Sequence, residues 1–313
     1  MDLPPALMPP LTDNAWLVLA LAEVTARPLE EVRRILASVQ RAPQRVLATE
    51  LRELGIRPYV YTPELEAYYQ QTDTYLFGGV VWNRDRYKVR MRQWIGEYLA
   101  RGSAGSRRVL TIGDGVGVDS LYLTQCGHRV ACFEPSDRCR RFARKLFDHC
   151  GQRLQVVGSL QEIAAGSCDV VLCLDVLEHV PDPLGMVADF ARCLCDGGLL
   201  VVHAPFYFVS PANPTHLDCN RRFSGDLRRL YGSQGFQLRD GRRNWDPLIL
   251  EKTPPGGVAR TPARASRIAE LRLMGWLFAV GRYWCAPHNL AASLAVGRGD
   301  RKWLQGLDAL PDS

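Results

Sequence analysis

The feature that most constrains the fold of this chain is an apolar run that stops at three closely spaced glycines. The run reads Val-Leu-Thr-Ile over residues 109–112, and the glycines are Gly113, Gly115 and Gly117. A helical pattern starts directly after them, so the segment predicts a buried strand, a tight turn and a helix N-terminus. Glycine is needed where the backbone turns sharply and approaches a ligand without a Cβ. The first turn of the helix is expected to offer free N–H groups to a polar or anionic ligand.

A carboxylate at the end of the next apolar run indicates the same kind of ligand. Residues 129–133 form that run, and Glu134 follows it. An acidic residue that closes the second strand of a βαβ unit, about 20 residues after the glycines, binds the hydroxyls of a ribose. The two segments together predict a nucleotide-type ligand.

Strand and helix patterns alternate through the middle of the chain. Strands are predicted at 108–112, 129–133, 154–157, 169–174, 198–204, 236–239 and 247–251, and helices at 119–126, 137–149 and 183–194. This alternation predicts an α/β fold with a doubly wound, seven-stranded sheet that helices cover on both faces. The ligand is expected outside the carboxyl ends of the strands, where the strand order reverses.

Three motifs occur in the order seen in a known enzyme family. They are the glycine segment, Glu134-Pro135-Ser136, and the segment 169–183, which reads DVVLCLDVLEHVPDP. Over residues 80–250 the chain resembles class I S-adenosylmethionine (SAM)-dependent methyltransferases. A nicotinamide-binding Rossmann enzyme is the alternative, but its G-x-G-x-x-G spacing is absent here. The resemblance implies a Rossmann-like fold and SAM as the cofactor.

The resemblance also implies which residues hold SAM. They lie in the glycine loop and at the ends of strands two, three and four, and they are Gly113, Asp114, Gly115, Gly117, Asp119, Glu134, Pro135, Ser159, Leu160, Asp175, Val176 and His179. The chain departs from the family pattern at Thr111, where an acidic residue usually positions the SAM amino group. Asp114 and Asp119 are the candidates to take over that role.

The long proline-broken loop after the fifth strand is predicted to form a wall of the acceptor pocket. His216 and Asp218 in this loop are the first candidates for proton transfer, and His203 and Tyr207 come next. Each of the four is equally compatible with a role in holding the loop together. His179 is expected to orient its loop rather than to act as a base.

Residues 1–80 are predicted to form an N-terminal helical lid domain in front of the SAM-binding domain at 81–252. Residues 253–313 are read as a linker and a C-terminal helical extension. The segment that contains Tyr75 and Trp82 is rich in aromatic residues and glycine. We expect it to close over the cofactor, because ring faces attract a sulfonium by roughly 0.5–2 kcal/mol. Ordinary packing of these rings is the alternative.

Composition and charge narrow the possible partners. The ten cysteines include no C-x-x-C pair or His/Cys quartet, so we expect a reduced, cytoplasmic protein without a metal site. The net charge of +6 is mild and basic residues do not alternate with aromatic ones, so a nucleic-acid partner is not expected. No apolar stretch reaches the roughly 20 residues that span a bilayer, so a membrane partner is not expected either.

These features predict a SAM-dependent methyltransferase that acts on a small-molecule acceptor by in-line transfer of the sulfonium methyl group. Secondary metabolism is the expected setting. The sequence does not distinguish oxygen, nitrogen and carbon acceptors. One alternative is a SAM-consuming cyclase similar to azetidine-2-carboxylate synthases, which release methylthioadenosine. Another is a non-catalytic SAM-binding partner protein. The N-terminal helices are a possible surface for homo-oligomer formation.

Overall fold

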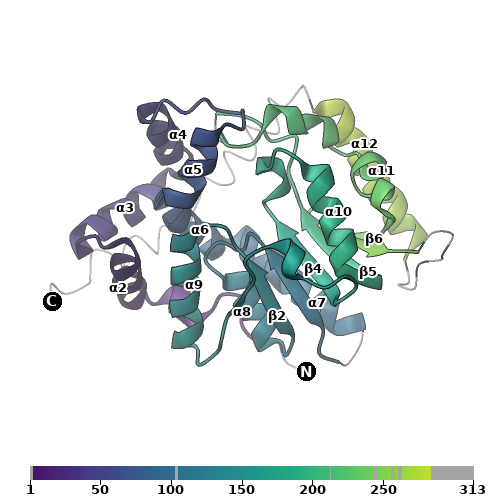
Figure 1. Cartoon of the computed structure of the whole chain (residues 1–313), viewed down its shortest axis with the longest axis horizontal. Helices are drawn as coiled ribbons and strands as arrows, with labels where there is room; N and C mark the ends of the chain where they lie inside the picture. The colour runs from purple at the N-terminus through teal and green to yellow at the C-terminus, as the bar shows by residue number, and fades with distance from the viewer. Residues whose placement is uncertain are drawn as a thin grey trace.

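A seven-stranded sheet forms the centre of the computed structural model, which describes residues 3–102, 105–211, 213–242, 245–254, 257, 259 and 263–282 (Figure 1). The strand order is β3-β2-β1-β4-β5-β7-β6, and β7 is antiparallel to both of its neighbours. The bounds are β1 (Arg108–Ile112), β2 (Arg129–Phe133), β3 (Gln155–Val156), β4 (Cys168–Leu174), β5 (Leu194–His203), β6 (Phe236–Gly241) and β7 (Leu248–Lys252). The predicted α/β sheet is confirmed, and its strand order reverses between β1 and β4.

Helices precede the sheet and then alternate with its strands. They are α1 (Pro9–Thr12), α2 (Asn14–Thr25), α3 (Leu29–Arg41), α4 (Pro43–Glu53), α5 (Pro63–Gln71), α6 (Thr74–Arg84), α7 (Arg86–Gly102), α8 (Val118–Gln125), α9 (Asp137–His149), α10 (Pro183–Cys193), α11 (Leu227–Leu230) and α12 (Ala265–Gly281). Short 3-10 turns are η1 (Leu160–Glu162), η2 (Leu177–His179), η3 (Asp218–Phe223) and η4 (Gly232–Gln234). Within the described residues, no helix is both long enough and apolar enough to cross a membrane.

The side chains of β4 point alternately into two hydrophobic clusters. Val170 and Leu172 belong to the cluster that contains α7, α8 and α9, whereas Val171 and Cys173 belong to the one that contains α10, α11 and α12. Because successive side chains of a strand face opposite sides of a sheet, a strand buried on both faces is a continuous apolar run. The sheet is therefore sandwiched between two layers of helices.

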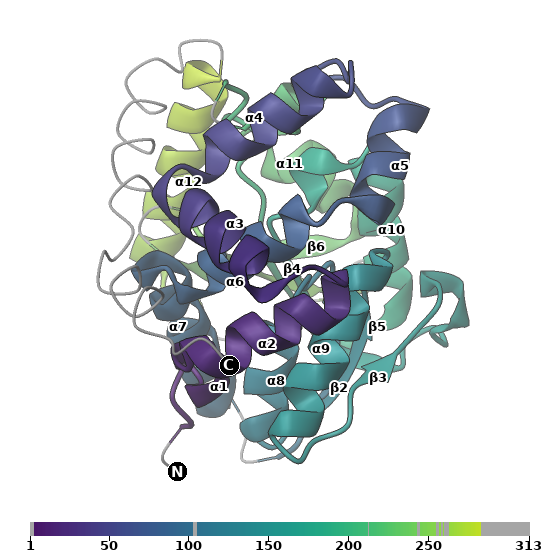
Figure 2. The same ribbon diagram turned by 90° about the vertical axis from the view of Figure 1, so that its left-hand side faces the viewer.

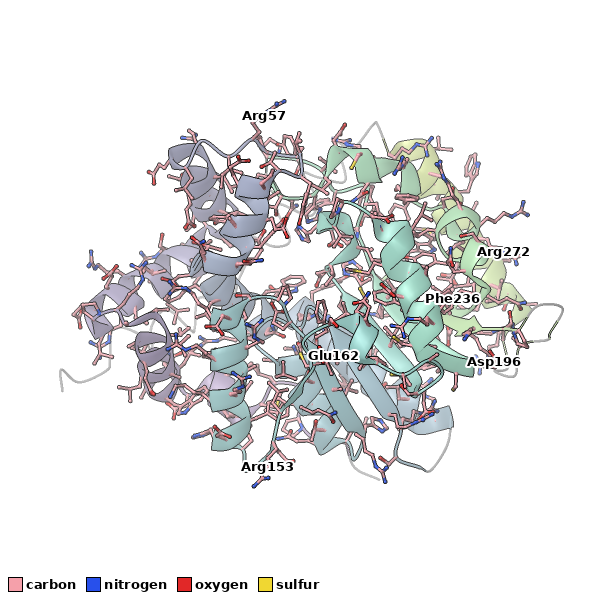
Figure 3. All side chains as sticks on the ribbon, in the orientation of Figure 1. Arg57, Arg153, Glu162, Asp196, Phe236 and Arg272 are labelled. Carbon is pink, nitrogen blue, oxygen red and sulfur yellow. The ribbon has the colours of Figure 1, made fainter. Side chains whose placement is uncertain are left out.

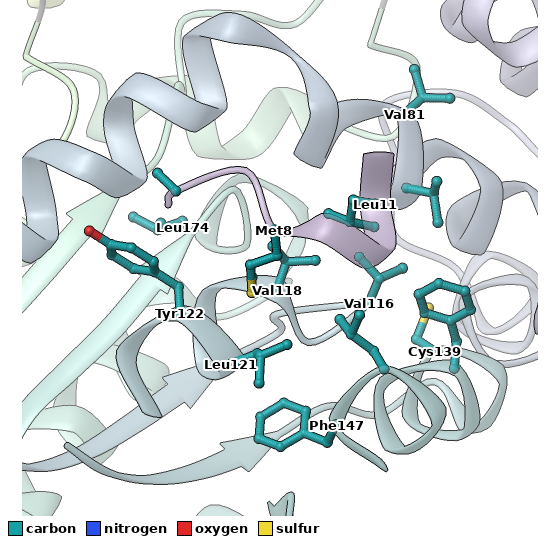
Figure 4. Packing of buried hydrophobic residues seen from close by; sticks show 14 of the residues in the cluster. Met8, Leu11, Val81, Val116, Val118, Leu121, Tyr122, Cys139, Phe147 and Leu174 are labelled. Carbon is teal, nitrogen blue, oxygen red and sulfur yellow. The ribbon is translucent and has the colours of Figure 1, made fainter. Parts of the chain in front are cut away.

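The N-terminal helices share the first of these clusters with the sheet. Figure 4 shows Met8 and Leu11 packed against Val116 and Val118, which come from the glycine loop and the start of α8. Figure 2 shows α2 beside α9, with α3, α4 and α5 above them. A single apolar core thus extends across the domain boundary drawn after residue 80.

A smaller cluster holds α4 and α5 against the long loop that follows β5. Leu217 of that loop packs with Leu51 and Leu65. Two backbone bonds add to this contact: the Tyr59 N–H donates to the Pro214 carbonyl (2.8 Å), and the Asp218 N–H donates to the Tyr59 carbonyl (3.0 Å). Residues 54–62, which connect α4 to α5, are therefore paired with residues 214–218; we call these two segments the lid connection and the wall loop. Arg57, at the far end of the lid connection, points away from the sheet (Figure 3).

Candidate active site

The three glycines between β1 and α8 all have positive φ, but they face different surroundings. A Cβ on Gly113 would lie 2.6 Å from Val176 Cγ2, and one on Gly117 would lie 2.6 Å from Ala143 Cβ. A Cβ on Gly115 would meet nothing within 4 Å. Gly113 and Gly117 therefore permit close packing inside the protein, and Gly115 leaves its backbone open toward a ligand.

Glu134 lies directly after β2 and is 7% exposed. One of its carboxylate oxygens accepts the Gly115 N–H (2.8 Å), and the other accepts the Ser136 N–H (2.8 Å). Burial raises the pKa of Glu134, and these two backbone donors oppose the rise. Because each carboxylate oxygen can accept two hydrogen bonds, one acceptor position on each oxygen remains for a pair of hydroxyls. Pro135 follows and continues the chain away from the sheet.

The first turn of α8 is capped by the protein itself. The carboxylate of Asp114 accepts the N–H groups of Asp119 (3.1 Å) and Ser120 (2.7 Å). Burial, together with the charge of Asp119, raises the pKa of Asp114 to about 7. The prediction that the first turn of this helix is free for a ligand is wrong for these two N–H groups, because a side chain of the same loop occupies them.

Asp114 and Asp119, the two carboxylates expected to compensate for Thr111, both bind groups of the protein itself. Thr111 is buried, and its hydroxyl bonds Ser120 Oγ (2.7 Å) rather than facing the sheet edge. Asp119 forms ion pairs with Arg92 (2.7 Å) and Lys88 (3.0 Å), both from α7. Burial favours the neutral form of Asp119, but these two cations outweigh it and lower its pKa. Asp119 therefore ties α8 to α7.

Two of the residues that the family resemblance assigns to SAM, Ser159 and Leu160, follow β3. Leu160 is buried, and the Ser159 hydroxyl donates to Glu162 (3.4 Å). Val176, directly after β4, packs against Gly113 as described above. These residues follow β3 and β4, which run parallel to β2 in the same sheet, so the structure brings them to the same edge as Glu134.

At the ends of β4 and β5, a histidine lies between two aspartates. His203 Nδ1 is 2.5 Å from Asp175 Oδ1, and its Nε2 is 2.7 Å from Asp246 Oδ1. Trp82 of α6 donates its indole N–H to Asp175 (3.0 Å), and Lys88 Nζ lies 3.5 Å from the same carboxylate. Asp175 thus holds the Trp82 indole at the end of β4, and the closure of this segment over the cofactor stays a prediction.

The pKa values of Asp246 and Asp175 are shifted in opposite directions. Burial raises the pKa of Asp246 well above its usual value. Burial also acts on Asp175, but attraction to His203 and Lys88 outweighs it and holds the pKa of Asp175 below its usual value. The imidazole of His203 therefore lies between a carboxylate, Asp175, and a carboxyl group whose protonated form burial favours, Asp246.

The lid and the wall loop meet at a second polar cluster. The Tyr75 hydroxyl donates to Thr215 Oγ1 (2.9 Å), and Tyr69 OH donates to the Thr215 carbonyl (3.4 Å). The rings of His179 and His216 are 4.7 Å apart. Burial and the neighbouring His179 lower the pKa of His216 well below its usual value, so His216 is neutral at pH 7.

Two of the predicted proton-transfer residues lie elsewhere. The Asp218 side chain is 68% exposed and pairs with Arg221 (2.7 Å). Tyr207 stacks on Phe278 of α12, with ring centroids 4.6 Å apart. Asp218 thus faces solvent, whereas Tyr207 packs against the hydrophobic cluster that contains α12.

The sequence reasoning missed four residues of this region, Lys88, Arg92, Glu178 and Asp246. Lys88 and Arg92 are four positions apart on one face of α7, and two buried cations at that spacing require an acidic partner. That spacing was a usable signal for Lys88. Glu178 was noted only as part of a motif, and Asp246 carried no local signal because its partner His203 is distant in the sequence.

Comparison with known proteins assigns the part of the chain that contains the glycine loop, Glu134 and His203 to a known family. A family model described as a methyltransferase domain matches residues 82–245, slightly more than half of the chain. A ubiquinone biosynthesis O-methyltransferase from Bordetella avium is 34% identical over 110 residues, which cover 34% of this chain and 45% of that protein. The corresponding enzyme from Aromatoleum aromaticum is 38% identical over 101 residues, or 31% of this chain and 43% of that protein. The chain thus spans about half the length of these curated relatives.

Solved structures resemble the chain more distantly. A Burkholderia thailandensis 1,6-didemethyltoxoflavin-N1-methyltransferase, crystallised with 1,6-didemethyltoxoflavin and S-adenosylhomocysteine, is 20% identical, with a TM-score of 0.45 over 62% of this chain and 92% of that one. A magnesium protoporphyrin IX methyltransferase from Synechocystis is 22% identical, with a TM-score of 0.40 over 52% of this chain and 80% of that one. With the family model covering residues 82–245, the chain belongs to the methyltransferase-domain family, as its resemblance to class I SAM-dependent methyltransferases predicted.

Proposed function

We propose that this protein binds SAM and transfers its methyl group to a hydroxyl of a small-molecule acceptor. The observation that carries the proposal is the Glu134 carboxylate, which keeps one free acceptor position on each oxygen beside the open backbone of Gly115. Such a carboxylate fits the two hydroxyls of a ribose. Membership of the methyltransferase-domain family supports the same ligand.

The residues present fit SAM along the whole sheet edge. Glu134 would hold the ribose, Leu160 would lie against the adenine, and Asp175 with Lys88 would face the methionine end. When bound, SAM supplies an already activated methyl group, so the protein has chiefly to align an acceptor with the S–CH3 bond. The Trp82 ring would lie near the sulfonium, where an aromatic face is favourable.

An oxygen acceptor is supported by two observations. The relatives with 34% and 38% identity are named as O-methyltransferases. A hydroxyl must also lose its proton to become a nucleophile, and His203 between Asp175 and Asp246 is a group that can take up that proton. A place in secondary metabolism stays a prediction, since the named relatives belong to ubiquinone biosynthesis.

The test measures product and binding separately. Purified protein is incubated with SAM and a panel of catechols and phenols, and S-adenosylhomocysteine release is followed; methyl transfer is expected with at least one hydroxylated acceptor. Methylthioadenosine formed from SAM alone would overturn the proposal in favour of the cyclase. Calorimetric binding of SAM without turnover on any acceptor would favour a non-catalytic partner.

Two variants assign the roles. Glu134→Ala is expected to weaken SAM binding about 10- to 100-fold, because two charge-assisted hydrogen bonds are lost. His203→Gln is expected to lower kcat by about 100-fold or more while SAM affinity is retained. His149→Gln, an exposed histidine on α9, is the matched control and should change neither quantity. Unchanged SAM affinity in Glu134→Ala would contradict the assignment.

A further inference from the structure

Three side chains with metal-binding groups converge where η2 meets the wall loop. Glu178 and His179 come from η2, and His216 comes from the wall loop. One potential donor atom of each lies within 4.8 Å of the other two. The backbone fixes this approach, since the Leu217 N–H donates to the Glu178 carbonyl (3.0 Å).

Glu178 is the unusual member of the group. Its side chain is 1% exposed, and neither carboxylate oxygen has a hydrogen-bond partner among the described residues. Burying a carboxylate without a partner is costly, so native proteins pair such groups or place them on a metal ion. The two oxygens therefore call for a positively charged or hydrogen-donating partner.

His179 turns a lone pair toward this carboxylate. Its Nδ1 is 3.1 Å from the Thr215 carbonyl oxygen, which can only accept, so Nδ1 carries the ring hydrogen. Nε2 then carries a lone pair, and it lies 3.9 Å from Glu178 Oε1. Two lone pairs that face each other in a buried site repel unless a cation or a proton lies between them.

His216 has a similar arrangement, but with the two ring nitrogens exchanged. The backbone of Phe208 favours a hydrogen on its ring. Because Nδ1 is buried without a partner among the described residues, we assign that hydrogen to Nε2, so that Nδ1 carries the lone pair. In metal sites, a ligating histidine usually donates its other ring nitrogen to a backbone carbonyl or carboxylate, as His179 does here.

We propose that Glu178, His179 and His216 bind one divalent first-row transition-metal ion, with Zn²⁺ as the best match. Two imidazoles and one carboxylate suit Zn²⁺ rather than Mg²⁺ or Ca²⁺, which prefer oxygen ligands. Ligands 2.0–2.2 Å from a tetrahedral ion lie about 3.5 Å apart, so binding draws these side chains together by about 1 Å. Three protein ligands leave a fourth position open for a substrate oxygen.

The site was not expected from the cysteine and histidine spacing, because its third ligand lies 37 positions beyond the second. A role in catalysis rests on the proposed methyl transfer, whereas ion binding itself does not. Asp175 and His203 are close enough to affect the pKa of His216, so the ion would lie near the proposed proton acceptor. There it would lower the pKa of an acceptor hydroxyl, the released proton would pass to His203, and the oxygen would form the new bond to the methyl carbon as the S–CH3 bond breaks.

The test begins with ion binding in the absence of any acceptor. Chelator-treated full-length protein is dialysed against Zn²⁺ and its bound metal is measured by mass spectrometry. Co²⁺ is added in parallel, and its visible absorption reports a nitrogen- and oxygen-ligated, low-coordinate ion. We expect close to one ion per chain in the natural protein. No retained Zn²⁺ and no Co²⁺ spectrum would overturn the proposal.

The variants locate the ion. Glu178→Gln and His216→Gln are each expected to weaken Zn²⁺ binding at least 10-fold and to change the Co²⁺ spectrum, while His149→Gln binds as the natural protein does. SAM titration of each variant verifies the fold and separates this proposal from the proposed function, because SAM affinity should be unchanged. Equal Zn²⁺ affinity in all three variants would show adventitious binding elsewhere and would overturn the assignment. In that case a proton shared by Glu178 and His179, rather than a metal ion, would relieve the repulsion between their facing lone pairs.

Discussion

Each glycine of the loop between β1 and α8 has its own physical reason to be glycine. Gly115 and Gly117 have φ of +60° and +78°, so a side chain strains the backbone at either position. Of these two, Gly117 also lacks room for a Cβ, because the new atom would lie 2.6 Å from Ala143 Cβ. Backbone freedom and close packing are therefore separable within one loop.

Alanine at these two positions is expected to have opposite consequences. Gly117→Ala should lower the free energy of unfolding by about 2–4 kcal/mol, since strain and overpacking add. Gly115→Ala should cost only about 1 kcal/mol of stability, but it should weaken SAM binding because the new Cβ faces the ligand. Urea unfolding and SAM calorimetry on both variants check this. A larger stability loss in Gly115→Ala would contradict it.

Asp114 predicts a pH dependence. In the folded protein its pKa is raised to about 7, whereas an unfolded aspartate titrates near 4. The folded state therefore binds the proton more tightly, and this stabilisation is complete below about pH 4 and is lost as the pH rises through 7. The slope is at most about 1.4 kcal/mol per pH unit.

Asp114→Asn removes the titrating group and should flatten that slope between pH 4 and 7. Urea unfolding at a series of pH values gives the comparison, and Asp226→Asn, at the N-cap of α11, is a control for loss of a capping carboxylate. Parallel curves for the natural protein and Asp114→Asn would rule out this assignment.

At the scale of elements, α4, α5 and α6 are joined through one carboxylate. Glu50 of α4 accepts hydrogen bonds from Tyr68 OH (2.7 Å) and Thr72 Oγ1 (3.1 Å), and also from Thr74 Oγ1. These donors lie at the end of α5 and the start of α6. The corner formed by the three helices holds Tyr69 and Tyr75 in the lid.

Glu50→Ala is expected to loosen this corner, because three hydroxyls lose their acceptor. We expect a loss of about 1–3 kcal/mol in the free energy of unfolding and faster amide exchange over residues 63–76. Glu53→Ala, an exposed residue on the same helix, is the control. Equal exchange rates in the two variants would show that Glu50 does not hold the corner.

The elements were predictable from the sequence to the extent that local patterns define them. Strands β1 and β2 and helix α9 have the predicted bounds, because apolar runs and helix caps such as Ser136 are local signals. The start of β5 was placed four residues late. Its first residues are polar and glycine-rich, and they pair with β4 through a register shift that no local pattern reveals.

The site was predictable only where motifs are continuous in the sequence. The glycines and Glu134 lie in one βαβ unit, so their spacing located them. The pairing of His203 with Asp246, and of His216 with Glu178, joins positions about 40 residues apart through tertiary structure. Such pairs depend on how distant segments of the chain fold back on one another, which a single sequence does not encode in any short pattern.

For the whole molecule, the shared core predicts that the N-terminal helices and the sheet unfold together. Leu17 of α2 is completely buried in the cluster that contains the sheet, whereas Leu19 of the same helix is 56% exposed. Leu17→Ala should cost about 2–5 kcal/mol, and Leu19→Ala should cost little. A single thermal transition, seen alike by aromatic circular dichroism and by amide exchange in β4, is the expected result. Separate transitions for α2 and β4 would show that the two parts are independent.

The hydrogen bonds that Tyr59 makes with Pro214 and Asp218 have a consequence for how molecules enter. Because these bonds join the lid connection to the wall loop, we expect the two segments to move together whenever the site opens. Because the wall loop carries His216, opening would also move one ligand of the proposed metal site away from the other two. Closure over the acceptor and assembly of the proposed metal site would then be one movement.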